Sequence, residues 1–87
     1  MDIEKFESLM GMARTFQDVD SRHTDFWRGY QHGLRRLYHG EKFGTDEEHW
    51  EWMNCADGDF RKELQAGYRA GFQGLTLNEI EQRGLRE

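Results

Sequence analysis

Hydrophobic side chains recur every three or four residues along most of the chain, which is the spacing of one face of an α-helix. The clearest case is segment 22–39, where Phe26, Tyr30, Leu34 and Leu37 fall four, four and three residues apart. No segment alternates apolar and polar residues over a useful length, and the chain contains no proline. The pattern therefore predicts an all-α protein and a strong amphipathic helix over 22–39.

Four further segments carry the same helical period, and we expect one domain over residues 1–87. The predicted helices are 2–16, 22–39, 45–54, 59–73 and a short one over 76–82. In the first and fourth helices, the apolar side chains expected on the core face are Ile3, Phe6, Met10, Ala13, Phe16, Phe60, Leu64, Tyr68 and Phe72. Residues 17–21 indicate a turn, with Ser21 or Thr24 as the next N-cap. The expected architecture is a small compact bundle of four main helices plus a short C-terminal helix.

Several residues have the types that start and stop helices. Gly40 and Gly74 follow helical segments directly, where a left-handed C-cap glycine is expected. Thr45-Asp46-Glu47-Glu48 and Thr76-Leu77-Asn78-Glu79 both have the Thr-x-x-Glu pattern of a capping box. These signals place the start of the third and fifth helices.

Two helices carry glycines four residues apart beside a tyrosine, in the motifs 29–34 (GYQHGL) and 67–72 (GYRAGF). A glycine inside a helix costs about 0.8–1 kcal/mol relative to alanine, so another interaction should offset it. Residues four apart share one helix face, and we expect the two helices to cross closely there. The residues assigned to this crossing are Gly29, Gly33, Gly67, Gly71, Tyr30 and Tyr68. The alternatives are a groove held open for a partner's helix or a nucleic-acid backbone, and loss of helix at these sites.

The two halves form an imperfect internal repeat. Each half has Asp-Phe, the Gly-Tyr-x-x-Gly motif, a helix-stopping glycine and a Thr-x-x-Glu box. The Asp-Phe pairs are 34 residues apart and the glycine motifs 38, so the register slips by about one helical turn. We expect the packing mode to repeat, and a true duplication stays open.

Composition places the chain in a broad class. It has 87 residues, one cysteine and a formal net charge of −5. A single cysteine excludes an intramolecular disulfide framework and favours a reducing compartment. Residues 1–10 have no signal-peptide character, and no apolar run approaches the ~18 residues of a membrane span. We expect a cytoplasmic protein without a membrane partner.

No residue constellation indicates catalysis, a cofactor or a metal. The four histidines and Cys55 form no H-x3-H or C-x2-C pair, which are spacings of structural zinc sites. His32 and His39 lie two helical turns apart, too far to share one ion. P-loop and dinucleotide fingerprints are absent from the sequence. We therefore expect a non-enzymatic protein without cofactor or metal.

Charge and exposed aromatic residues point to a protein partner. Segment 41–59 holds seven acidic residues against one lysine, whereas arginines gather in the second helix. Trp52 is expected to be exposed and Trp50 to lie in the core or an interface, and an exposed tryptophan is a typical interface anchor. The candidate partner-binding residues are Trp52, Glu47, Glu48, Glu51, Arg35 and Arg36. The hypothesis is a small acidic interaction module that could mask a basic surface of its partner; solvated faces that only pair with each other are the alternative.

A second hypothesis comes from a family resemblance. Arg28-Gly29-Tyr30-Gln31-x-Gly33-Leu34 resembles the Arg-Gly-Tyr-Gln-Ala-Gly-Ile helix of ribosome modulation factor, a small two-helix family implicated in ribosome hibernation. Residues 64–69 correspond loosely to that family's second helix. The resemblance implies an RNA- or ribosome-associated factor working through Arg28, Arg35, Arg36 and the two tyrosines. That family is basic and this chain is acidic, so nucleic acid would have to bind through the second helix alone.

Overall fold

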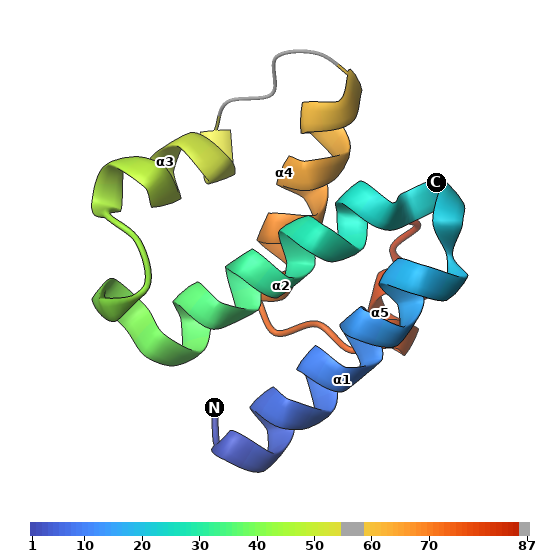
Figure 1. Cartoon of the computed structure of the whole chain (residues 1–87), viewed down its shortest axis with the longest axis horizontal. Coiled ribbons are helices and arrows are strands. Elements are labelled where there is room, and N and C mark those ends of the chain that lie inside the picture. The colour runs from blue at the N-terminus through green and yellow to red at the C-terminus, as the bar shows by residue number, and fades with distance from the viewer. Residues whose placement is uncertain (55–58, 86–87) are drawn as a thin grey trace.

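The computed structural model describes residues 1–54 and 59–85, and its regular elements there are all helical (Figure 1). The elements are α1 (Ile3–Val19), α2 (Thr24–His39), α3 (Asp46–Asn54), α4 (Asp59–Phe72) and α5 (Leu77–Gln82), with 3-10 turns at Ser21–His23 and Gly40–Lys42. The predicted all-α bundle of four main helices and a short C-terminal helix is confirmed. The radius of gyration, 12.0 Å, is that of a compact domain of this length.

The first helix is longer than its pattern predicts. Asp2 caps α1 by accepting a hydrogen bond from the Lys5 amide at 2.8 Å, and the helix continues to Val19. The turn expected at 17–21 is therefore mostly wrong, because residues 17–19 include no glycine or proline to end the helix. Asp20 ends it instead, and its carboxylate accepts from the Trp27 indole at 3.2 Å. Neither Ser21 nor Thr24 caps α2 through a side chain.

The other predicted helix ends are largely confirmed. Gly40 and Gly74 adopt φ values of 64° and 66°, the left-handed region that glycine reaches without strain. Thr76 makes both halves of its capping box with Glu79. Thr45 accepts from the Glu48 amide at 3.1 Å, which is the first half of the predicted box.

The two glycine motifs meet where α2 crosses α4, and this is the largest helix–helix interface. A Cβ atom built on any of the four glycines would approach a backbone carbonyl oxygen of the other helix closer than 3.0 Å, a separation that real Cβ atoms essentially never show. The pairs are Gly29 with Leu64, Gly33 with Tyr68, Gly67 with Phe26, and Gly71 with Tyr30. An α-hydrogen of each glycine takes the place of the Cβ and points at the carbonyl, in the manner of a Cα–H···O contact.

This crossing confirms the close-packing prediction and excludes the open-groove alternative, because each glycine strip is filled by the opposite backbone. Cα–H···O contacts contribute about 0.5–1 kcal/mol each. The helix-propensity cost of an interior glycine is about 0.8–1 kcal/mol. The two magnitudes are similar, so the crossing offsets much of the cost of placing glycine in both helices.

The crossing is locally two-fold symmetric. Gly29 and Gly33 meet Leu64 and Tyr68 in the same chain order, so the helices run in the same direction where they cross. The contacts are reciprocal. Each glycine packs on the residue that lies three positions before its equivalent glycine in the other helix. The repeated packing mode is therefore confirmed at the 38-residue offset. In chain order, α3 comes between the two crossing helices.

Different helices cover the two sides of the α2–α4 crossing (Figure 1). On one side, α1 and α5 close the main core, whose fully buried large side chains are Phe26, Trp27, Tyr30, Leu34 and Ile80. The Tyr30 hydroxyl donates to the Leu75 carbonyl at 2.6 Å. On the other side, Tyr68 lies beneath α3. The equivalent tyrosines of the two motifs thus flank the crossing on opposite sides.

Some core predictions are wrong at the edges of the bundle. Ile3 is 56% exposed, because it starts α1 beyond the end of the core, and Leu37 is 36% exposed near the end of α2. Trp27 is completely buried, although the apolar stripe of the sequence did not include it. The side chain of Phe60 and the whole of Cys55 lie outside the described residues.

Candidate functional site

The third helix is held against the crossing by a stack of aromatic rings. Trp52 lies between His32 of α2 and Tyr68 of α4, with ring centroids 5.0 and 5.2 Å away and interplanar angles of 25° and 24°. Offset stacking of this kind contributes about 0.5–1.5 kcal/mol per pair beyond burial. The stack joins α2, α3 and α4, and it fixes which face of α3 points inward.

A polar contact supports the same inner face. The His49 Nδ1 atom lies 2.7 Å from the Tyr68 hydroxyl, and its ring packs 4.6 Å from that of Phe72. Burial lowers the pKa of His49, and nearby Arg36 lowers it further while Asp46 raises it. Burial raises the pKa of the Tyr68 hydroxyl. Both side chains are therefore neutral near pH 7, and their hydrogen bond does not depend on a charge.

The end of α3 is bound to α4 through one carbonyl. The Met53 carbonyl accepts from the Gln65 side chain at 2.7 Å and from Nε of Arg69 at 2.9 Å, and a second Arg69 nitrogen also donates to it. Carbonyls in the last turn of a helix lack intrahelical donors and carry partial negative charge. A guanidinium at this position therefore satisfies and stabilises the C-terminal end of α3.

The start of α3 is bound to α2 through Arg36. This side chain is 8% exposed, and its guanidinium donates to the Asp46 carboxylate at 2.7 Å and to the Gly44 and Phe43 carbonyls at 3.2 and 3.4 Å. The prediction that Arg36 contacts a partner does not fit this position, because the guanidinium is buried in contacts within the chain. Arg36 positions the loop and the first turn of α3.

These contacts leave the opposite face of α3 toward solvent. Trp50 is 61% exposed, and Glu47 and Glu51 beside it are also exposed. Glu47 lies three residues before Trp50 and four before Glu51, so these three side chains share one face, which is opposite the inward rings of His49 and Trp52. We name Glu47, Trp50 and Glu51 the outer face of α3.

The exposure expected for the two tryptophans is reversed. Trp52 is half-buried in the stack, and Trp50 is the exposed one. Two positions apart, these residues lie about 200° apart around the helix and so on opposite faces. The sequence does not decide which face is the inner one, because the helix has few apolar residues to define it. The one histidine of this helix, His49, lies on the same side as Trp52. When its amphipathic ring is counted as polar, the inward stripe is not recognised.

The remaining predicted site residues lie apart from the outer face. Glu48 is exposed near the start of α3, where its amide bonds to Thr45. Arg35 is half-buried on α2, with its guanidinium carbon 5.9 Å from the Phe43 ring centroid. Arg28 is exposed and pairs with Asp25 at 3.5 Å. The arginines of α2 therefore do not form one continuous basic stripe with Arg36.

Metal sites and membrane spans are two further kinds of feature to consider in residues 1–54 and 59–85. In that part of the chain, no three His, Cys, Asp or Glu side chains come together as a metal site. Among the same residues, no helix is long and apolar enough to cross a membrane. Comparison of the chain with protein-family models, curated proteins and solved structures found no match.

Proposed function

We propose that this protein is a non-enzymatic interaction module that uses the outer face of α3 to bind a basic surface of another protein. The observation that carries the proposal is the exposure of Trp50, 61%, on a helix whose inner face is fixed by ring stacking. A large apolar side chain on a rigid helix loses little conformational entropy when it is buried in an interface. Trp50 thus takes the anchoring role that the sequence hypothesis gave to Trp52.

Charge selects the kind of partner. The outer face carries Glu47 and Glu51, the first turn of α3 adds Asp46 and Glu48, and the whole chain has a net charge of −5. Interfaces place opposite potentials together, which speeds association and disfavours partners of the same sign. A partner surface rich in Lys or Arg fits these acids, and occupation of that surface would mask it from nucleic acid. The single cysteine favours a reducing compartment, and we place this role in the cytoplasm.

The test is affinity capture from an extract of the source cells, run with and without nuclease. Trp50→Ala should abolish recovery of a defined protein, since loss of an anchoring tryptophan costs about 2 kcal/mol or more, roughly a 30-fold weaker complex. Glu47→Gln with Glu51→Gln should weaken recovery and its dependence on salt. Val19→Ala is the matched control, because Val19 is 73% exposed at the end of α1, away from α3.

The outcomes separate the two hypotheses. Recovery of the same protein by wild type and Val19→Ala, with loss in Trp50→Ala, supports the outer face. Equal recovery in all variants refutes it. Recovery that nuclease abolishes in the wild type refutes it as well, and favours the RNA- or ribosome-associated alternative.

A further inference from the structure

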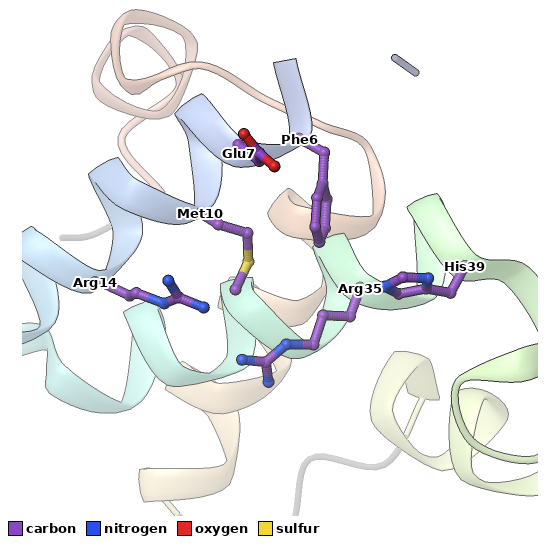
Figure 2. A pocket seen from close by; sticks show the side chains of 6 residues that line it. All are labelled: Phe6, Glu7, Met10, Arg14, Arg35 and His39. Carbon is purple, nitrogen blue, oxygen red and sulfur yellow. The ribbon is translucent and has the colours of Figure 1, made fainter. Parts of the chain in front are cut away.

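A second surface feature is lined by side chains of α1 and α2. Helix α1 lies across α2 from α3 (Figure 1). It is a pocket of about 520 Å³, within the size range of small-molecule sites. Figure 2 shows its lining side chains, which are Phe6, Glu7, Met10 and Arg14 from α1 and Arg35 and His39 from α2. This pocket shares no residue with the outer face of α3.

The pocket contains two guanidinium groups, those of Arg14 and Arg35. Among the described residues, neither Arg14 nor Arg35 forms an ion pair, and Glu7 forms none either. Both arginine side chains extend along the same side of Met10 in Figure 2. Two like charges on neighbouring helices repel each other, and an anion between them would remove this repulsion while gaining charge-assisted hydrogen bonds.

One wall of the pocket is apolar and held in place. The Phe6 ring stacks on Tyr38 at 4.3 Å with an interplanar angle of 14°, and His39 meets Phe6 edge-on at 5.6 Å. Met10 is 3% exposed and forms the floor. A ligand with an apolar or aromatic body therefore finds a fixed surface beside the two cations.

The acidic groups limit the size of the anion. Glu7 lines the same pocket, and the chain as a whole carries a net charge of −5. A long polyanion would meet this negative charge along most of its length. A single anionic group avoids that repulsion, and a hydrogen-bond donor on the same ligand would suit Glu7.

We propose that the pocket binds a small organic anion, with its carboxylate or phosphate group between Arg14 and Arg35 and its apolar body against Phe6 and Met10. This site is independent of the proposed partner-binding face. A ligand bound there contacts both α1 and α2, so its binding to the folded state stabilises the packing of these two helices.

Titration of the isotope-labelled full chain with phenyl phosphate, followed by NMR chemical shifts, tests the proposal. We expect saturable shifts confined to the pocket residues of α1 and α2, and weaker binding of inorganic phosphate, which lacks the ring. Arg14→Gln and Arg35→Gln should each weaken binding about tenfold through loss of a charge-assisted contact. Arg22→Gln is the matched control, since Arg22 is exposed in the 3-10 turn before α2, away from the pocket.

The amide spectrum of each variant verifies that its fold is unchanged. If Arg35→Gln unfolds, Arg14→Gln still tests the proposal, because Arg14 is exposed. Shifts that never saturate would overturn the proposal. Equal weakening by Arg22→Gln would overturn it too. A benzoate titration distinguishes a carboxylate from a phosphate ligand, and tighter binding of a single-stranded oligonucleotide to the same arginines would contradict the small-ligand assignment.

Discussion

Gly33 of α2 packs directly on the backbone carbonyl of Tyr68 in α4, and no side-chain atom fits between them. The equivalent contact joins Gly71 to Tyr30. Both neighbours are backbone atoms of a helix, so they cannot rotate away as a flexible side chain would. The distance between the two central helices is therefore set by glycine, and every other part of the bundle is arranged around that distance.

Gly33→Ala should destabilise the protein even though alanine favours helix. The added methyl group would force the crossing apart, at an overpacking cost of about 1–3 kcal/mol or more. The helix-propensity gain of about 1 kcal/mol offsets only part of this cost. We expect a net loss of about 1–2 kcal/mol in the free energy of unfolding, measured by urea denaturation.

Gly11→Ala is the matched control for that prediction. Gly11 also lies inside a helix, but a Cβ built there meets nothing within 4 Å. Helix propensity alone should then act, and we expect a gain of about 0.5–1 kcal/mol. Opposite signs for the two substitutions support the crossing, and a stabilising Gly33→Ala contradicts it.

Tyr30→Phe should also destabilise the fold. The Tyr30 hydroxyl is completely buried and donates to the Leu75 carbonyl at 2.6 Å, so its removal leaves a buried acceptor without that donor. The expected loss is about 1–2 kcal/mol, measured by thermal or urea unfolding. Tyr38→Phe is the control, because the half-buried Tyr38 ring stacks on Phe6 and meets His39, and its hydroxyl has no hydrogen bond within residues 1–54 and 59–85. An equal loss in both variants would show that the Leu75 contact is unimportant.

Arg36→Met should release the start of α3 more than Asp46→Asn does. Asp46 is 83% exposed, and solvent screens its pair with Arg36 to about 0–1 kcal/mol. Arg36 additionally serves the Phe43 and Gly44 carbonyls from a buried position, so its loss should cost about 2–3 kcal/mol. Near-ultraviolet circular dichroism of the Trp52 stack follows the change. A larger effect of Asp46→Asn would contradict this assignment of roles.

Acidification should destabilise the packing of α3 against α2 and α4. Burial lowers the folded-state pKa of His32 and of His49 below the ordinary 6.5, and Arg35 and Arg28 lower that of His32 further. The unfolded chain therefore binds protons more readily, so stability is complete above about pH 6.5 and is lost as the pH falls through the folded pKa values. The pKa of Glu79 is also lowered, but this carboxylate changes the stability only below its ordinary pKa of 4.5. Its effect is therefore separate from that of the histidines.

The experiment compares unfolding free energies at about pH 7.5 and pH 5 for the wild type and His32→Phe. Phenylalanine keeps a ring against Trp52 and removes the titrating group. We expect a smaller loss of stability on acidification in His32→Phe than in the wild type. An identical pH dependence would show that His32 does not contribute to it.

Much of the bundle could be predicted from the sequence because its signals are local. Helical spacing, the glycines at 40 and 74 and the Thr76 capping box act within a few residues of themselves. The glycine pairs also predicted a contact between distant segments. Glycine inside a helix is unfavourable, so a close backbone contact was expected to offset its cost, and the other glycine-containing helix was the simplest partner for that contact. The resemblance to ribosome modulation factor rests on these same residues and stays a prediction.

The candidate site was harder to predict because it depends on contacts between distant segments. The burial of Arg36 requires the loop at 43–44 to fold back on α2, and nothing in its neighbouring residues indicates that. Trp52 and Trp50 differ only in which face of a short helix meets Tyr68, a residue far along the chain. Trp27 is buried by α1 and by its bond to Asp20, which lies before α2 and outside the helix pattern.

The central functional claim is that Trp50 anchors a protein partner, and site-specific photo-crosslinking in intact cells tests it most directly. A photoreactive residue replaces Trp50 in one variant and Val19 in another, both being exposed positions on different helices. We predict a crosslink to one defined protein from position 50 and none from position 19. Crosslinks to RNA from position 50, or the same protein adducts from both positions, would contradict the claim.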